Sequence, residues 1–348
     1  MTNYNLKSGN QLSPSSIRIW RIVQVLLLFV GAGFLFGLIF YPDIGLQVFW
    51  NVFITIVPAF LVIAVGLWRN ICPMASLSLF PRHIGISKKK KLTDTQSGKL
   101  NLIAIVALLV LVPLRHAIFD MNGLATALLI ISLGVISIIA GYLYDWKSAW
   151  CSSLCPVYPI EKLYGLKSTF SLPNAHCDEC HRCVTPCPDT TPEINPLSSK
   201  KTTYHKISGF LTVAALPGFI WGWFQVPAYP GTIGMQELFA IYKLPILGLL
   251  VSCMLYLVMK RFFQERVLIS IFSATAVSCY YWFRLPALFG FGMSPETGTL
   301  IDLTAVLPEW SMTLLVISTA LFFFWWIVFN KQNKNPWVIR PVYADKVA

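Results

Sequence analysis

The chain has 348 residues, of which 56% are hydrophobic and 12% are charged, and its formal net charge is +12. Soluble domains carry about 25% charged residues, so this composition excludes an ordinary soluble protein and favours one that lies in a membrane. The basic excess alone does not indicate nucleic acid, because the lysines and arginines fall between long apolar stretches.

Eight apolar stretches of about 20 residues are each long enough to cross a bilayer as a helix. They lie near residues 17–40, 46–67, 100–118, 123–144, 207–227, 237–259, 266–289 and 311–330. The first has Arg18 and Arg21 ahead of its apolar run and no small-residue cleavage site behind it, so we expect a retained signal anchor. The sequence predicts an all-α integral membrane protein with about eight transmembrane helices.

Lysine and arginine cluster in alternate connections between these stretches. The positive-inside rule assigns such connections to the cytoplasm, which puts both termini there and predicts a multi-pass protein of a bacterial inner membrane. The four lysines at 88–91 lie beside a helix end, where anionic lipid headgroups are one expected partner. A topology signal with no specific ligand is the other interpretation, and neither involves nucleic acid.

Four regions follow from this pattern. Residues 1–144 form an N-terminal four-helix membrane region with a basic cytoplasmic loop at 68–99. Residues 207–330 form a C-terminal four-helix region, and residues 331–348 are expected to be a cytoplasmic tail. Between the two helical regions, residues 145–206 form a proline-containing cytoplasmic segment that is too short for a robust apolar core of its own.

One run of cysteines dominates this middle segment. The spacing is C-x2-C-x2-C-x3-C-P, by which bacterial ferredoxins hold iron–sulfur clusters. Zinc sites usually pair two C-x2-C units across a longer spacer, and disulfides are not expected where thiols stay reduced. The run therefore predicts a ferredoxin-like loop that binds a [4Fe–4S] cluster. Its members are Cys177, Cys180, Cys183 and Cys187, with Pro188 behind them.

Two partial copies of the motif precede the run. Cys151 and Cys155 stand in a C-x3-C-P half-motif, and Cys72 stands in a Cys-Pro pair. Each copy follows an expected span at its cytoplasmic end. Trp68 occupies the position of the earlier cysteine in the upstream copy, so we interpret the two as a weak internal repeat.

In two-cluster ferredoxins the fourth cysteine of each run ligates the other cluster. By that rule a first cluster would take Cys177, Cys180, Cys183 and, as the crossing ligand, Cys155. A second cluster would take Cys187 in the crossing role, together with Cys151 and Cys72. Two cubes need eight ligands, so one is missing, and a three-iron cluster or a single cluster stays open. The candidates for the eighth ligand are Cys253, Asp178, His176, His181, a residue of a partner, or none.

The segments WRNICPMASL, WCSSLCP and CDECHRCVTPCP resemble those of the NapH/NosR-type polyferredoxin-like family, over roughly residues 46–190. The resemblance implies a membrane electron-transfer subunit with two [4Fe–4S] clusters that links the quinone pool to a respiratory or oxidative enzyme. This chain departs from the pattern at Trp68, has four spans after the cluster segment, and lacks a flavin-binding periplasmic domain. The neighbouring CcoG-like proteins use similar motifs in copper-oxidase assembly, which implies a maturation role instead.

A second set of polar residues lies at the outer ends of two expected spans. Ionisable groups at such depth are costly and often functional. A quinone headgroup needs hydrogen-bond donors and a proton acceptor, which His116 and Asp120 would supply, with Arg115 and Arg284 in the same layer. The other interpretation is an Arg115–Asp120 ion pair that closes the helix end.

The sequence leaves three functional hypotheses. The leading hypothesis is a membrane-bound subunit with one or two [4Fe–4S] clusters that relays electrons between the quinone pool, or a cytoplasmic donor, and a partner redox enzyme. No catalytic residue of its own is expected. The second is an assembly factor that reduces a metal or a thiol of another membrane enzyme. The third is a channel or transporter with a redox-sensing loop, which the few buried charges of the last four helices disfavour.

Overall fold

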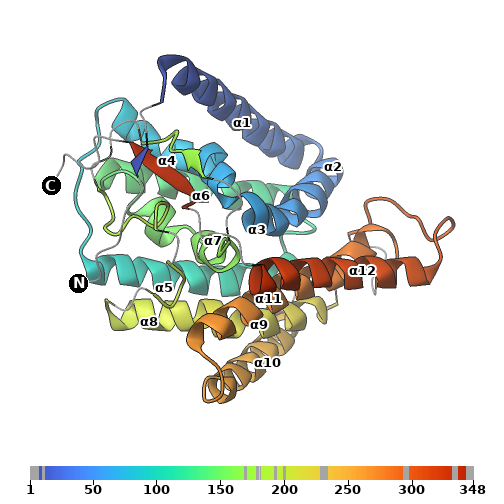
Figure 1. The fold of residues 1–348 in the computed structure, drawn as a ribbon. Helices are drawn as coiled ribbons and strands as arrows, with labels where there is room; N and C mark the ends of the chain where they lie inside the picture. Colours follow the sequence, from blue (N-terminus) through green and yellow to red (C-terminus); the bar gives the residue numbers. More distant parts are fainter. Residues whose placement is uncertain are drawn as a thin grey trace.

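The computed structural model describes residues 8–9, 12–167, 171–177, 180, 182–191, 194–198, 201–227, 234–292, 298–330 and 336–341. This part of the chain is mostly helical, and eight of its helical segments are long and apolar enough to cross a membrane (Figure 1). The prediction of eight long apolar helices is therefore confirmed. Their bounds are Pro14–Phe40, Pro42–His83, Asp94–Arg115, Gly123–Leu143, Thr203–Phe224, Met235–Met259, Glu265–Leu288 and Glu309–Phe329.

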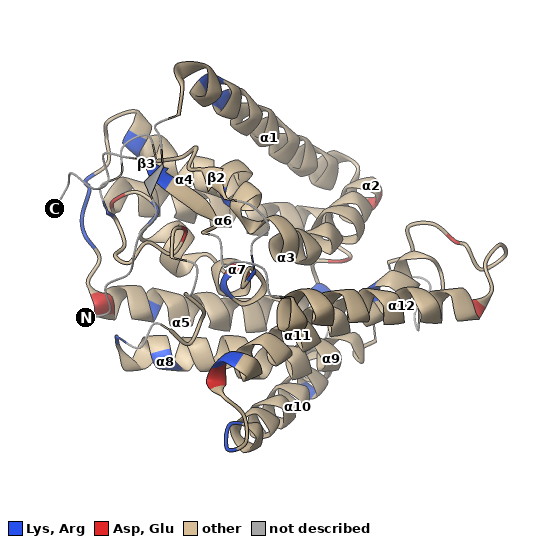
Figure 2. Ribbon diagram, in the orientation of Figure 1, with Lys and Arg blue, Asp and Glu red and all other residues tan. Residues whose placement is uncertain are grey.

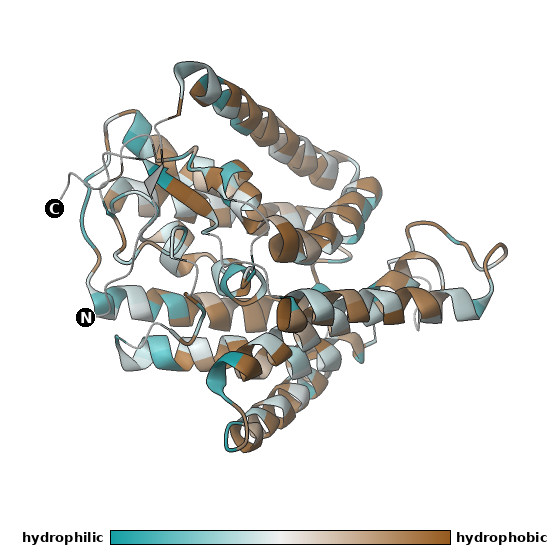
Figure 3. Cartoon of the chain, viewed as in Figure 1, coloured by the Kyte–Doolittle hydropathy of each residue, from teal (hydrophilic) through white to brown (hydrophobic). Residues whose placement is uncertain are grey.

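The first half of the chain supplies α1 to α6. Its elements are α1 (Pro14–Phe40), α2 (Pro42–Leu46), the π-helix η1 (Gln47–Phe53), α3 (Ile54–Ile71), α4 (Pro73–His83), α5 (Asp94–Leu111), the 3-10 turn η2 (Pro113–Arg115) and α6 (Gly123–Leu143). Large apolar side chains remain exposed along α1, and its surface is largely brown in Figure 3. Such a surface is suited to contact with lipid.

The second half begins with the cysteine-bearing segment and continues through four more spans. Its elements are the π-helix η3 (Trp150–Leu154), α7 (Tyr158–Tyr164), α8 (Thr203–Phe210), the π-helix η4 (Leu211–Ala215), α9 (Leu216–Phe224), α10 (Met235–Met259), α11 (Glu265–Leu288), α12 (Glu309–Phe324) and the π-helix η5 (Trp325–Phe329). The helices α8 and α9 with η4 between them make one continuous span.

The third span lies earlier in the chain than the expected 100–118. Helix α5 begins at Asp94, where the Thr93 hydroxyl accepts a hydrogen bond from the Gln96 N–H and the Gln96 side chain accepts one from the Thr93 N–H. This capping box fixes the start of the helix. Pro113 follows its end and opens η2. Asp94 and Lys99 lower the mean hydropathy of the first turns. A search for a continuous apolar stretch therefore places the start of this helix too late.

The segment at 68–99 is not simply a basic loop. Helix α3 runs on to Ile71, and α4 follows it directly. Helix α4 packs closely on α6, because a Cβ added at Gly141 would lie 1.7 Å from the carbonyl oxygen of Ser78. The first half of the segment is therefore helical and part of the bundle.

A small parallel sheet, in the order β1-β3-β2, joins three distant parts of the chain. Its strands are β1 (Ser8–Gly9), β2 (Leu172–Pro173) and β3 (Val338–Pro341). Leu172 pairs with Val338, and the Asn174 N–H donates to the carbonyl of Ile339 at 3.0 Å. Residues 336–341 belong to the expected tail at 331–348, yet they are bonded to the cysteine-bearing segment.

Helix α7 anchors the cysteine-bearing segment in the main apolar core. Leu163 and Tyr164 are buried in it against residues of α3, α9, α10 and α11. The hydroxyl of Ser273, on α11, donates to the carbonyl of Leu163 at 2.7 Å. The segment is therefore continuous with the helical bundle and does not stand apart from it.

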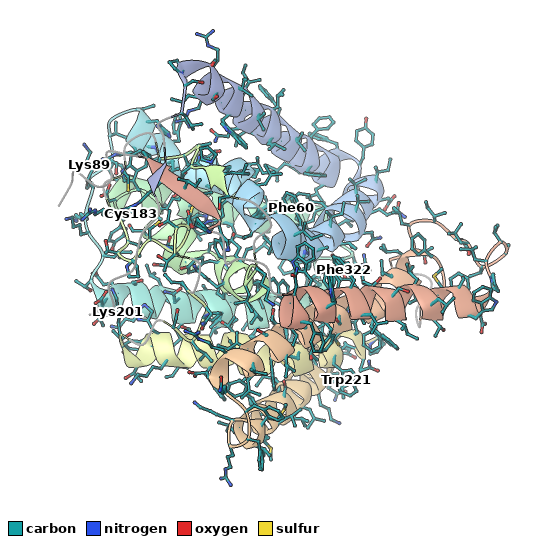
Figure 4. The ribbon with its side chains drawn as sticks, in the orientation of Figure 1. Phe60, Lys89, Cys183, Lys201, Trp221 and Phe322 are labelled. Atoms are coloured by element: carbon teal, nitrogen blue, oxygen red, sulfur yellow. The ribbon has the colours of Figure 1, made fainter. Side chains whose placement is uncertain are left out.

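Helix α5 connects two polar regions of the molecule. Near its start the Ser97 hydroxyl lies 3.1 Å from that of Ser153, between Cys151 and Cys155 in the chain. We call this region the cysteine end. From Ser97 to Leu111 the helix rises by about 21 Å, and η2 then leads to Arg115, in the region that we call the arginine end. Figure 4 labels Cys183, Lys89 and Lys201 on the same side of the view, and Figure 2 shows basic residues at the start of α1 and in the connection between α4 and α5.

Candidate functional site

The four cysteines of the ferredoxin-like run line a single cavity at the cysteine end. Its volume is about 30 Å³, and Lys147, Asp189 and Arg340 line it as well. Each thiol comes from one short stretch of chain, in which Arg182 takes a left-handed backbone conformation with φ of 51°. The cysteines of this first group are Cys177, Cys180, Cys183 and Cys187.

Hydrogen bonds to the backbone hold both ends of this run in place. The side-chain oxygen of Asn174 accepts from the N–H groups of His176 and Cys177 at 3.0 and 3.2 Å. The carbonyl of Cys187 accepts from the N–H groups of Thr190 and Thr191 at 3.2 and 3.1 Å. The cavity therefore lies between two tightened turns.

The other three predicted ligands form a second group. Cys72, Cys151 and Cys155 share one apolar cluster with Ala75 and Trp150. These thiols come from two segments, the corner between α3 and α4 and the π-helix η3 with the residue after it. The structure brings them together although about 80 residues of sequence separate the segments.

The two Cys-Pro corners have the same local structure. Cys72 has φ −57° and ψ 120°, and Cys155 has φ −62° and ψ 122°. Each ends a helical segment, and a helix starts within three residues of each. An extended ψ is what a following proline requires of the residue before it. The weak repeat in the sequence therefore corresponds to a repeated corner in the fold.

The grouping of the cysteines differs from the crossed assignment. That assignment joined Cys155 to the first set and Cys187 to the second. In the structure Cys187 lines the cavity with the other members of its own run, and Cys155 packs with Cys72 and Cys151. The structure thus keeps the four cysteines of the run around one cavity and groups Cys72 with Cys151 and Cys155.

Burial makes the free thiolates of both groups unfavourable. It raises the pKa of Cys151 and that of Cys177 to about 12, although the nearby Lys147 opposes the shift at both. A thiol with so high a pKa is largely protonated at neutral pH. A bound metal favours the thiolate, because ligation requires the deprotonated sulfur and a cation stabilises it.

A buried ion network lies beside both groups, and its centre is Arg69. Its guanidinium donates to Asp189 through Nε and Nη2, at 3.0 and 2.6 Å from Oδ1. Nη1 donates to Glu161 at 2.9 Å and to the carbonyl of Cys151 at 3.0 Å. Lys147 reaches the other oxygen of Asp189 at 3.5 Å. Burial alone would raise the pKa of Asp189, but the charges of Arg69 and Lys147 outweigh it and hold the pKa well below its usual range.

Trp68 has a definite role in this network. It occupies the position at which a second C-x3-C-P would have its earlier cysteine, and its indole N–H donates to Glu161 at 2.9 Å. Glu161 thereby binds both Trp68 and Arg69 from the same turn of α3. At this position the chain therefore has no thiol. It has instead an indole that holds α7 through Glu161.

Sequence reasoning missed several residues of this site. Lys162 donates to the carbonyl of Pro188 at 2.9 Å, and its Nζ lies 4.2 Å from the centre of the Trp337 ring. Asp189, through its carbonyl, accepts from the Val338 N–H at 2.9 Å. The only sequence signal was the position of Asp189, two residues behind the last cysteine. Nothing local marks Trp337, because its contacts reach back across about 170 residues.

Of the candidates for the eighth ligand, His176 is the most distinctive. It is fully buried, and neither ring nitrogen has a hydrogen-bond partner among the described residues. Cys253 is in the membrane helix α10, apart from both groups. Asp178 and His181 lie outside the described residues.

No three His, Cys, Asp or Glu side chains in the described ranges converge tightly enough to hold a single metal ion. A cubane cluster makes a different demand, because its four irons and four sulfides separate the ligands from one another. All four thiols of the run line one cavity, but its volume of about 30 Å³ is that of about one water molecule, so binding of a cubane would require the cavity to widen.

The predicted polar residues of the opposite end also come together. Arg115, His116, Asp120 and Arg284 all line one cavity of about 420 Å³ at the arginine end. The Arg115–Asp120 ion pair is present at 2.9 Å. His116 places Nε2 3.1 Å from the carbonyl of Trp223, and since a carbonyl only accepts, that nitrogen carries the proton.

Comparison of the chain with protein-family models, with curated proteins and with solved structures gives no match. The functional argument therefore depends on the residues and their geometry.

Proposed function

We propose that this chain is a membrane-bound electron-transfer subunit that holds [4Fe–4S] clusters at its cysteine end. The observation that carries the proposal is the lining of one cavity by all four cysteines of a C-x2-C-x2-C-x3-C-P run. Cys177, Cys180, Cys183 and Cys187 would hold the first cluster. Such clusters carry one electron at a time, at a potential set by burial and by hydrogen bonds to sulfur.

A second cluster is proposed at Cys72, Cys151 and Cys155. These thiols are packed together, and a fourth ligand would come from His176, from a partner, or from solvent. Metal ligation supplies folding free energy, which accounts for a segment rich in proline that keeps one shape between two helical regions.

The residues around the two cysteine groups would position the clusters and offset their negative charge. Thiolate-ligated clusters bring negative charge into a buried site, which is costly unless cations lie nearby. Lys147 lies near Cys177 and Cys151, one cysteine of each group. Arg69 lies beside the second group, where it holds the carbonyl of Cys151. The chain itself transforms no substrate in this scheme; it orients the ligands and excludes water.

A second cavity supports electron entry at the same end. It has a volume of about 400 Å³, lies between α5 and α8, and reaches Cys183. This volume is within the range of about 300–1,000 Å³ for ligand pockets. A quinone headgroup, or a short segment of a cytoplasmic donor, would approach the first group there. Ser97, Asn101, Lys162 and His205 supply polar groups on its walls.

The proposed setting is the inner membrane of a bacterium, with the cysteine end in the cytoplasm. The basic connections support this orientation through the positive-inside rule. A redox enzyme or other membrane subunits would receive the electrons, or deliver them.

The experiment that tests this function is spectroscopy on protein purified without oxygen. Visible absorption and low-temperature EPR are measured for the native chain, for Cys183→Ser and for Cys253→Ser. We expect a cubane spectrum in the native chain, its partial loss in Cys183→Ser, and no change in Cys253→Ser, because Cys253 lies in a membrane helix away from both groups. Equal spectra of the two variants, or no cluster in any preparation, would refute the proposal.

A further inference from the structure

The cavity at the arginine end contains a buried cation without an anionic partner in the described part of the chain. Arg284, on α11, is 6% exposed. Its Nε donates to the Thr55 hydroxyl at 3.1 Å, and its Nη2 donates to the carbonyl of Trp50 at 3.4 Å and to the side-chain oxygen of Asn51. All of these acceptors are neutral, and the carboxylate whose charge acts on Arg284, that of Asp120, is already paired with Arg115. A buried charge that lacks a counter-charge is costly, so the site favours an anion.

The second arginine of the cavity is already neutralised. Arg115 is 7% exposed and pairs with Asp120 at 2.9 Å. Its guanidinium also lies over the rings of Trp50 and Trp223, 4.0 and 5.0 Å from their centres. The pair leaves Arg284 as the excess charge of the buried lining. Asp43 also lines the cavity, but its side chain is exposed to solvent.

One part of the remaining wall is aromatic. Phe224 and Phe283 stack with ring centres 5.2 Å apart, and Trp223 meets Phe224 edge-on at 4.5 Å. All three line the same cavity as Arg284. Its volume of about 420 Å³ is in the range of sites that hold small ligands. The lining therefore offers the guanidinium of Arg284 together with a patch of aromatic rings.

We propose that this cavity binds an amphiphilic anion, a molecule whose carboxylate or phosphate pairs with Arg284 while its apolar part lies on Phe224, Phe283 and Trp223. A guanidinium presents two parallel donors to the oxygens of either group. The site is separate from the cysteine end and does not depend on the presence of clusters.

A quinone fits this cavity less well, although the same four residues suggested one. A neutral quinone leaves the charge of Arg284 uncompensated. The cavity is also separated from the cysteine groups by the length of α5, about 21 Å from Ser97 to Leu111, and electron transfer rates fall steeply with distance.

The source of the anion is either the bilayer or the solution, and the choice of probes separates the two. Isothermal titration calorimetry is performed on the full chain in a neutral detergent. The probes are dihexanoyl phosphatidylglycerol, dihexanoyl phosphatidylcholine, hexanoate, inorganic phosphate and a short-chain ubiquinone. Binding of phosphatidylglycerol alone identifies a lipid as the ligand class, and binding of hexanoate or phosphate as well identifies a soluble anion.

Three variants test the role of the charge. Arg284→Gln is expected to weaken binding of the anion by about tenfold or more, the usual value of a charged hydrogen bond. Lys243→Gln is the matched control, since Lys243 is an exposed cation on α10 that does not line the cavity. It should leave binding within about twofold of the native value.

Asp120→Asn should act in the opposite direction. It releases Arg115 and adds a second free cation to the cavity, so anions should bind more tightly. If Arg284→Gln does not fold, this variant still tests whether positive charge in the cavity controls anion binding. The proposal is overturned if phosphatidylcholine or the quinone binds as tightly as the best anion, if Arg284→Gln binds like the native chain, if Asp120→Asn fails to tighten binding, or if no probe binds.

Discussion

The guanidinium of Arg69 holds the carboxylate of Asp189, with Nη2 2.6 Å from Oδ1. Arg69 stands three residues before Cys72, and Asp189 stands two residues after Cys187. The ion pair therefore connects the chain beside the second cysteine group to the chain beside the first. This ion pair thus contributes to the placement of the two groups relative to each other.

Replacement of Arg69 by Gln should be strongly destabilising. The change leaves Asp189 and Glu161 buried without their main counter-charge, and loss of one partner from a buried pair costs about 3–5 kcal/mol. We expect a clear fall in the melting temperature of the purified protein. Lys201→Gln is the control: its ion pair with Asp94 is exposed, and such pairs contribute at most about 1 kcal/mol. Equal melting temperatures of the two variants would contradict the central position of Arg69.

Trp68→Phe should remove one hydrogen bond without changing iron content. Glu161 loses its indole donor, and the expected cost is about 1 kcal/mol of stability. Iron per chain should stay at the native value, because Trp68 is an anchor and not a ligand. Trp310→Phe, at an exposed position, serves as the control for the loss of an indole. A marked loss of iron in Trp68→Phe alone would show that the indole does more than hold α7.

Gly141→Ala should loosen the contact between α4 and α6. The new methyl group would lie 1.7 Å from the carbonyl of Ser78, so the helices must separate. Gly134→Ala is the matched control on the same helix, because its nearest neighbour is 3.5 Å away, at the side chain of Leu77. That variant gains helix propensity, worth about 1 kcal/mol. Thermal unfolding should therefore shift downward for Gly141→Ala and stay level or rise for Gly134→Ala; the reverse order would refute the close packing.

The grouping of the cysteines can be tested with a triple variant. In Cys72→Ser/Cys151→Ser/Cys155→Ser we expect about four iron per chain and an undisturbed cubane spectrum, since the first group keeps all four of its thiols. The crossed arrangement would remove one ligand from that cluster as well. A three-iron EPR signal in the triple variant would therefore support the crossed arrangement and contradict the grouping seen here.

The eight spans were predictable because each is a continuous apolar stretch of the length that a bilayer requires. Helix α4 was not, since Pro81, Arg82 and the lysines that follow it read as a loop. In the structure α4 packs on α6 through the close approach of Ser78 to Gly141, a contact that the sequence alone does not show.

The cysteines of the site were predictable from their spacing, but their surroundings were not. Arg69 and Asp189 are 120 residues apart, and no local pattern pairs them. Trp337 and Arg340 belonged to an expected tail, and the pairing of β2 with β3, together with the bond from the Val338 N–H to the Asp189 carbonyl, brings them to the cysteines. At the other end, Arg115 and Asp120 are close in sequence, so their ion pair was one of the two expected arrangements and is present.

Iron and acid-labile sulfide per chain, measured with low-temperature EPR on protein purified without oxygen, test the central claim most directly. The account predicts about eight iron per chain and two interacting cubane signals, one from each cysteine group. About four iron would contradict the second cluster and make Cys72, Cys151 and Cys155 structural. No iron, with zinc in its place, would contradict the electron-transfer function altogether.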